Sequence, residues 1–275
     1  MIAENLIGVL LKINSTQALT YSILNMRKIK ISSFTIIFCL MANIAFSQKN
    51  ILKQDMIWAS YSLKLQTSPK ITVGVAYQDR YLMPFRIHHR LTTVGVAYKI
   101  SEQWTVEYNQ MLFFLSLPQD GAQDIEVSIP ELRPMQVVTH HPKSAGKWSL
   151  VYRFMLEERF IRKHSEKALQ DGYNFNFRFR YLFGGALPLI YSKKEETPQK
   201  KVSLNLSGEF MLNYGKIIEN TFNQSRLIAG GSYHINPNLQ LNLSYIHWFL
   251  QRNTGANYVR WDILQVSLAQ KIKLY

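Results

Sequence analysis

The chain has 275 residues, a formal net charge of +14 and a mean hydropathy of −0.11, with 47% hydrophobic and 13% aromatic residues. At this length one large domain is expected. No window of 18 residues is free of charged and polar side chains, so the sequence predicts no transmembrane helix. The single cysteine, Cys39, excludes a disulfide framework within the chain.

A segment with the three parts of a secretory signal peptide begins at Met26. Its start is basic, with Arg27, Lys28 and Lys30. Residues 31–46 are mainly apolar, and Ala45-Phe46-Ser47 is a small-x-small cleavage sequence. We therefore predict cleavage after Ser47; a short core helix or an inner-membrane anchor is the alternative.

Cleavage at this position divides the chain into three parts. Residues 1–25 are predicted to be an upstream extension outside the fold, residues 26–47 the signal-peptide helix, and residues 48–275 the mature domain. Because Cys39 lies in the signal peptide, the mature domain has no cysteine. That excludes disulfides, thiolate catalysis and cysteine-based metal sites.

The mature domain remains strongly basic. Residues 1–47 hold four Lys and Arg and one Glu, so their removal lowers the net charge from +14 to +11. In an exported chain this balance favours contact with membrane lipid and lipopolysaccharide phosphates over nucleic acid, which we do not expect as a partner. Solvated loop charge remains an equally open alternative.

Apolar and polar side chains alternate with period two along most of the mature chain, which is the period of a β-strand. In residues 172–184, six aromatic side chains alternate with Asn and Arg. The predicted strands, in chain order, are 56–65, 70–80, 87–100, 103–115, 128–141, 147–161, 172–184, 202–214, 226–235, 239–249 and 258–274.

One apolar face and one polar face with occasional charges are typical of strands that cross a bilayer around a wet lumen. Bacterial single-chain barrels have an even number of strands. We therefore predict an all-β fold, a closed antiparallel transmembrane β-barrel of about 12 strands, in which residues 48–55 add one strand. Ten strands is the alternative, because Pro130 and Pro134 weaken residues 128–141 as a strand. A secreted soluble β-barrel or sandwich is the competing fold.

The polar faces of these strands carry charges of both signs. Because desolvating a lone charge costs several kcal/mol, inward charges must be paired. We predict a cross-strand network that fills a narrow lumen; a selectivity lining or a polar-ligand site is the functional alternative. Its candidate members are Arg80, Glu107, Glu131, Arg153, Glu157, Arg159, Arg178, Arg180, Glu209 and Arg226.

Four blocks carry a family resemblance: PELRPMQ with Glu131 and Arg133, YRFMLEERF at 152–160, FRFRYLFGGALPL at 177–189 and the segment 223–249. Together they resemble an uncharacterised outer-membrane family of Bacteroidota, domain-of-unknown-function family 2490. The resemblance implies an outer-membrane β-barrel with no assigned activity. The inward Arg and Glu positions of the blocks are present here, which implies a shared interior network and identifies no ligand.

We therefore expect a passive outer-membrane barrel: a small channel for polar or anionic solutes, a ligand-binding barrel or a structural envelope protein. The alternative from another class is a lipid hydrolase of the outer-membrane phospholipase type, because His140 and His141 lie close to Ser144. His88-His89 and His164 have no partners at metal-ligand spacing. We expect no enzymatic activity, no cofactor and no metal site.

Overall fold

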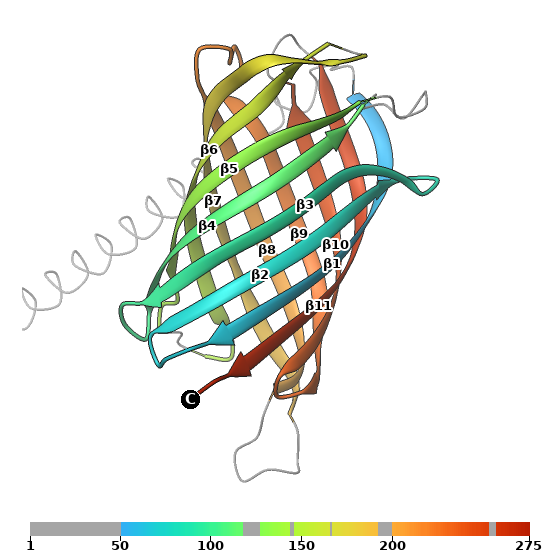
Figure 1. The fold of residues 1–275 in the computed structure, drawn as a ribbon. Helices are drawn as coiled ribbons and strands as arrows, with labels where there is room; N and C mark the ends of the chain where they lie inside the picture. Colours follow the sequence, from blue (N-terminus) through green and yellow to red (C-terminus); the bar gives the residue numbers. More distant parts are fainter. Residues whose placement is uncertain (1–50, 118–126, 144–145, 166, 192–199, 253–256) are drawn as a thin grey trace, which may run out of the picture. The chain divides into compact units, whose positions relative to one another are not determined.

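The computed structural model describes residues 51–117, 127–143, 146–165, 167–191, 200–252 and 257–275. The predicted upstream extension, signal peptide and cleavage site lie outside the described residues. Strands joined by turns make up the described part of the chain (Figure 1). No helix in this part is long and apolar enough to span a bilayer.

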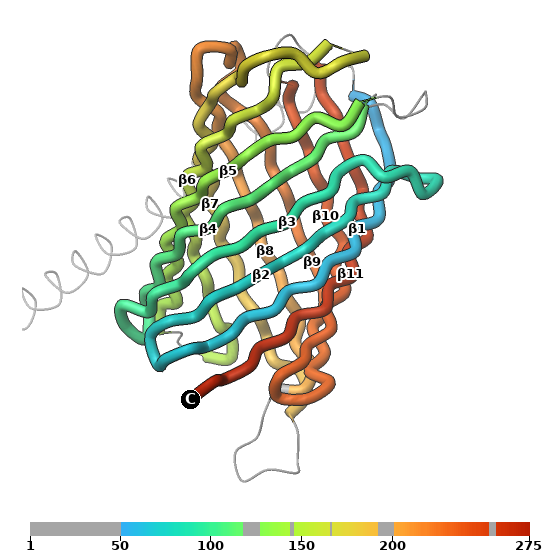
Figure 2. The backbone as a smooth tube through the Cα atoms, viewed as in Figure 1, coloured from blue at the N-terminus to red at the C-terminus, as the bar shows by residue number. Residues whose placement is uncertain are grey.

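In the described residues, eleven strands form a closed barrel (Figures 1 and 2). Each pairs antiparallel with its neighbours in the sequence, and β1 closes the barrel by pairing in parallel with β11. The strands are β1 (Ile51–Gln66), β2 (Ile71–Leu82), β3 (Arg86–Lys99), β4 (Trp104–Ser116), β5 (Ser128–His140), β6 (Ser149–His164), β7 (Leu169–Tyr191), β8 (Lys200–Tyr214), β9 (Phe222–Asn236), β10 (Leu239–Gln251) and β11 (Tyr258–Lys273).

The prediction of about 12 strands is wrong, and so is the alternative of ten. Residues 51–55 were expected to help form an extra strand, but they are the first five residues of β1 and pair with β11. With an odd number of strands in an up-and-down order, the first and last run in the same direction. Their pairing is therefore parallel, from Ile51 opposite Tyr258 to Gln66 opposite Lys273.

The proline-bearing segment forms a complete strand, β5. Its pairing with β4 runs without interruption from Ser128 to His140. Its pairing with β6 lapses between Leu132 and Met135 and then resumes in the same register. Pro134 lies in this gap and has no N–H to donate to the ladder, so the proline costs a few bridges without ending the strand.

The aromatic row of β7 faces outward, as the alternation predicts. Tyr173, Phe179 and Phe183 are 50–55% exposed on the outside. Between them, Asn176 and Arg178 point inward and are 0% and 4% exposed. Strand β7 thus places aromatic side chains on the outer surface of the barrel and polar ones inside.

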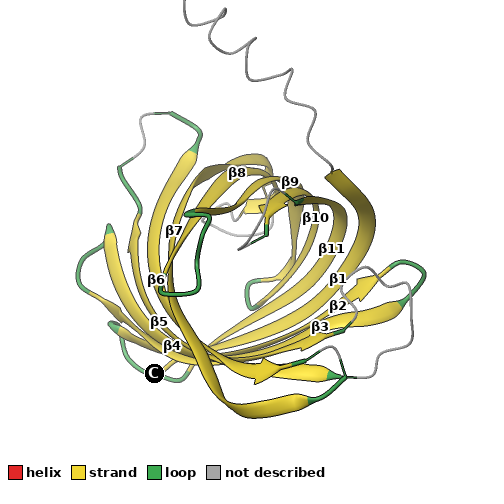
Figure 3. Cartoon of the chain, turned by 90° about the horizontal axis from the view of Figure 1, so that it is seen from above, coloured by secondary structure: helices red, strands yellow, loops and turns green. Residues whose placement is uncertain are grey.

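The strands form a ring when seen from above (Figure 3), and two parts of its inner surface differ in chemistry. The strands that close the barrel, β1, β2, β10 and β11, contribute an apolar cluster: Met56, Trp58, Leu82, Ile246, Trp248, Val259, Trp261 and Ile263. The opposite wall, from β5 to β9, carries buried Glu and Arg side chains. The candidate site lies where these walls meet.

Candidate functional site

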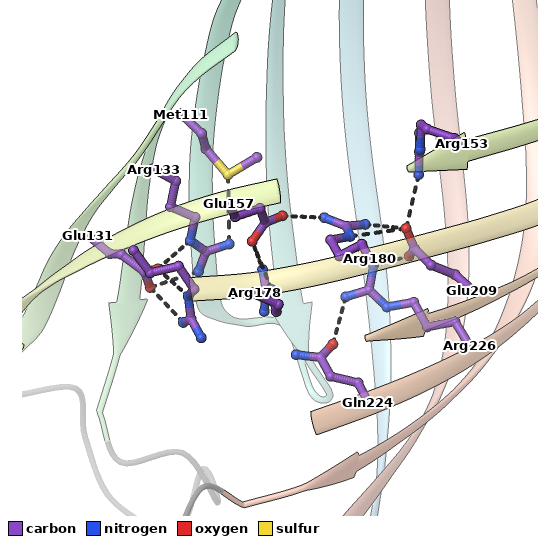
Figure 4. Close-up of polar contacts among 11 residues, drawn as sticks. Met111, Glu131, Arg133, Arg153, Glu157, Arg178, Arg180, Glu209, Gln224 and Arg226 are labelled. Atoms are coloured by element: carbon purple, nitrogen blue, oxygen red, sulfur yellow. Dashed lines mark hydrogen bonds and ion pairs between the residues drawn. The ribbon is translucent and has the colours of Figure 1, made fainter. Parts of the chain in front are cut away.

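Strand register sets the first cluster of interior charges, which extends over β6, β7, β8 and β9 (Figure 4). Glu157 lies directly opposite Arg178, and Glu209 lies directly opposite Arg226. Arg180 connects the two carboxylates: its Nη1 is 2.6 Å from Glu157 Oε1 and its Nη2 is 2.6 Å from Glu209 Oε1. Strand pairing therefore places Arg178 and Arg226 beside their carboxylates, and Arg180 on β7 reaches diagonally to both neighbouring strands.

Further contacts link Arg178, Arg153 and Arg226 to the two carboxylates of this cluster. Arg178 binds Glu157 Oε2 through Nε at 2.8 Å and also through Nη2. Arg153 Nη2 donates to Glu209 Oε1 at 3.0 Å, and Arg226 Nη1 reaches Glu209 Oε2 at 3.4 Å. Two buried carboxylates thus bind four guanidiniums, which leaves the cluster positively charged.

A second cluster surrounds Glu131 on β5. Arg133 approaches its carboxylate with two nitrogens at 2.5 and 2.8 Å, and Arg159 on β6 does so at 2.6 and 3.0 Å. Paired parallel hydrogen bonds from a guanidinium to a carboxylate are among the strongest in proteins. One carboxylate here holds two such forks, so this cluster also carries excess positive charge.

The structure joins eight of the ten predicted network residues by ion pairs: Glu131, Arg153, Glu157, Arg159, Arg178, Arg180, Glu209 and Arg226. Glu107 and Arg80 are not among the ion pairs of the described residues. Among the described residues, Glu107 accepts a long hydrogen bond from Asn109, at 3.5 Å. The predicted site omitted Arg133, although period two places it on the same face as Glu131.

Arg80 instead lies against a group of three buried tryptophans, Trp58, Trp248 and Trp261, which we call the tryptophan platform. The ring centroids of Trp58 and Trp248 are 5.5 Å apart, and those of Trp248 and Trp261 are 4.4 Å apart. The Arg80 guanidinium carbon is 3.9 Å from the Trp58 centroid. The sequence contained no local signal for this contact, because the three indoles come from β1, β10 and β11.

A cavity of about 940 Å³ lies between these groups. Among the described residues, two carboxylates line it, Glu107 and Glu131. Its basic lining residues are Lys64, Arg80, Arg133, Arg153, Arg159, Arg178, Arg180, Arg226 and Arg252. Even with the buried Glu157 and Glu209 counted, the described lining has more cations than anions, so it attracts anions.

The histidines proposed for alternative chemistry have other surroundings. The His140 ring stacks on Trp104 with centroids 4.2 Å apart, and the proposed nucleophile Ser144 lies outside the described residues. His88 is the extra residue of a β-bulge, and it packs against His89 at 4.1 Å between centroids. Within the described ranges, no three His, Cys, Asp or Glu residues gather in a group that could hold a metal ion.

A family model described as "Protein of unknown function (DUF2490)" matches residues 55–260, most of the barrel. The chain belongs to the DUF2490 family. This confirms the resemblance to domain-of-unknown-function family 2490 that the four sequence blocks carry. Every residue of the charge network lies within the matched region.

Comparison with solved structures finds this DUF2490 chain similar to the NanC porin, with a TM-score of 0.40 and 9% sequence identity. The match covers 73% of this chain and 89% of the porin chain. Comparison with curated proteins gives no match. The family's description names no activity, so the functional argument rests on the interior geometry.

Proposed function

We propose that this DUF2490 chain is an outer-membrane β-barrel that provides a narrow passive pathway for small anions. One observation carries the proposal: exposed apolar side chains cover the outside of a closed barrel, and among the charged residues that line its interior cavity cations outnumber anions. A water-soluble barrel would bury its apolar faces and expose its polar ones. The predicted signal peptide supports export to the outer membrane.

The apolar exterior supports contact with lipid. Exposed side chains such as Phe154, Phe210, Leu243 and Tyr245 come from several strands, each 45–56% exposed. Contiguous apolar surface of this kind marks a contact with membrane or protein. Lipid and lipopolysaccharide are the partners that fit a band running around a barrel.

The interior supports preference for anions. Excess positive charge in a confined, low-dielectric passage concentrates anions and repels cations. The neutral polar chain of Asn205, Ser232 and Asn242 on β8, β9 and β10 offers hydrogen bonds without adding charge. The cationic clusters therefore set the sign of the selectivity.

Planar-bilayer recording tests this function. Protein whose folding is verified by heat-modifiable gel migration is inserted into a bilayer under a KCl gradient. The expected result is a small conductance whose reversal potential shows preference for chloride over potassium. Cation preference, or no current above background, would reject the channel.

The second candidate is a non-conducting ligand-binding barrel. It is favoured by the ion pairs and indoles that occupy both walls of the interior, since long side chains fill barrels of this size. Absence of current from a folded, inserted barrel supports this candidate.

We propose a passive role in either case. A phospholipid-hydrolysis assay tests that proposal against the lipid-hydrolase alternative. Hydrolysis that is lost in Ser144→Ala would replace the passive role with an enzymatic one.

A further inference from the structure

Arg80 and Arg226 differ from the other interior arginines in the groups that orient them. Arg80 Nε donates to Gln78 Oε1 at 2.7 Å, and Arg226 Nη2 donates to Gln224 Oε1 at 3.2 Å. Both partners are amides two residues earlier on the same strand. Arg133 has the same spacing to a carboxylate, Glu131. A glutamine therefore fixes each guanidinium without cancelling its charge.

The two arginines share the tryptophan platform. Arg80 is on β2 and Arg226 on β9, and β1, β11 and β10 lie between them in the barrel. The Arg80 guanidinium carbon is 3.9 Å from the Trp58 centroid and 5.9 Å from that of Trp248. For Arg226 the corresponding distances are 5.5 and 4.3 Å. Two like charges thus lie over the same pair of rings.

This region has more hydrogen-bond donors than acceptors. In the described part of the chain, Trp58 Nε1, Trp248 Nε1 and Arg226 Nε are buried without a partner. Within the described residues, the carboxylate that reaches Arg226 is Glu209, at 3.4 Å, and it already binds two closer guanidiniums. A buried donor without an acceptor destabilises the fold, because it loses its hydrogen bond to water without gaining another. A negatively charged group bound here would accept hydrogen bonds from these donors and would neutralise part of the excess positive charge.

We propose that Arg80 and Arg226 form a binding site for a small oxyanion, a carboxylate or a phosphate, at the tryptophan platform. A guanidinium fork matches the paired oxygens of these groups, whereas chloride offers no such geometry. Arg80, Arg226 and Trp248 all line the interior cavity, so an anion in the lumen reaches them. The site deepens the proposed function, since it rests on access through a cationic lumen.

Tryptophan fluorescence of the purified, folded barrel tests the site directly. Three of the five tryptophans of the chain form the platform, so an anion bound there changes their emission. Acetate, inorganic phosphate and chloride are titrated separately at constant ionic strength. We expect a saturable change with acetate or phosphate, and the more effective of the two identifies the oxyanion. A response to neither, or an equal response to chloride, would overturn the site.

Three variants test its location. Gln78→Glu gives Arg80 an internal carboxylate like that of the Glu131–Arg133 pair, so it retains the fold and is expected to weaken oxyanion binding by about tenfold or more. Arg226→Gln removes one fork and is expected to have a similar effect. Lys64→Gln removes a cation that also lines the cavity but lies about 20 Å along β1 from Trp58, so it is expected to change binding less than about twofold. Unchanged binding in Gln78→Glu, or equal weakening in Lys64→Gln, contradicts the proposal.

Fluorescence and conductance separate this site from the proposed channel. Saturable binding without current retains the site and rejects the pathway. Anion-selective current without saturable binding retains the pathway and rejects the site.

Discussion

Glu157 is a fully buried carboxylate that binds Arg178 and Arg180 inside the barrel. Arg178 is itself 4% exposed. A buried ion pair gains little over an apolar pair, because desolvation offsets the attraction. Removing one partner is different, since the remaining charge stays buried without compensation.

Glu157→Gln is therefore expected to lower the free energy of unfolding by about 3–5 kcal/mol, because it preserves shape but leaves the buried Arg178 without its carboxylate, whereas Arg180 keeps its ion pair with Glu209. Denaturant unfolding of the refolded barrel in lipid vesicles measures this change. Glu102→Gln is the matched control: its side chain is 89% exposed beside Lys99, so about 0.5 kcal/mol or less is expected. An equal decrease in the free energy of unfolding in the two variants would show that Glu157 does not compensate buried positive charge.

At the scale of the strand, β9 approaches β10 closely at one glycine. A Cβ on Gly230 would lie 2.5 Å from the Leu243 carbonyl oxygen and 2.8 Å from Ser244 Cα, both backbone atoms. A Cβ on Gly231, on the other face of the same strand, would meet nothing nearer than Ser203 O at 3.8 Å. The absence of a side chain at Gly230 permits this close approach.

Gly230→Ala is expected to destabilise the barrel by about 1–3 kcal/mol, because backbone cannot yield as a flexible side chain can. Gly231→Ala is expected to be neutral or to stabilise it by up to about 1 kcal/mol, through lower entropy of the unfolded chain. Parallel unfolding curves compare the two neighbouring substitutions. A larger loss from Gly231→Ala would contradict the close approach of β9 and β10.

On the scale of the whole molecule, the proposed outer-membrane location depends on which environment surrounds the exposed apolar surface. Leu206, near the middle of β8, is 43% exposed, and Tyr214, at the end of the same strand, is 69% exposed. In water, substitution of either exposed side chain changes stability by about 0.5 kcal/mol or less. In a bilayer the cost of a charge depends on its depth.

Leu206→Arg is expected to reduce the free energy of folding into lipid by about 2–4 kcal/mol, and Tyr214→Arg by about 0–1 kcal/mol. Folding titrations in phosphatidylcholine vesicles compare the two variants with the unmodified chain. If both variants were as stable as that chain, the outer surface would not face acyl chains.

Local alternation of side chains was sufficient to locate the strands, to assign their outer and inner faces and to nominate eight residues that the structure joins by ion pairs. Alternation is local because successive side chains point to opposite faces of any strand. It also placed Arg133 beside Glu131, although the predicted site left it out.

The closure of the barrel and the interaction partners of its interior charged side chains depended on contacts between strands far apart in the chain. The parallel pairing of β1 with β11 joins residues about 200 positions apart. Local alternation marked eleven strands, but the even number expected of bacterial barrels led to the wrong prediction of 12. Arg80 was expected to have a carboxylate partner, but the closed barrel places it over Trp58 and near Trp248. Closure brings these strands together in space, and only then does an interior charge acquire its neighbours.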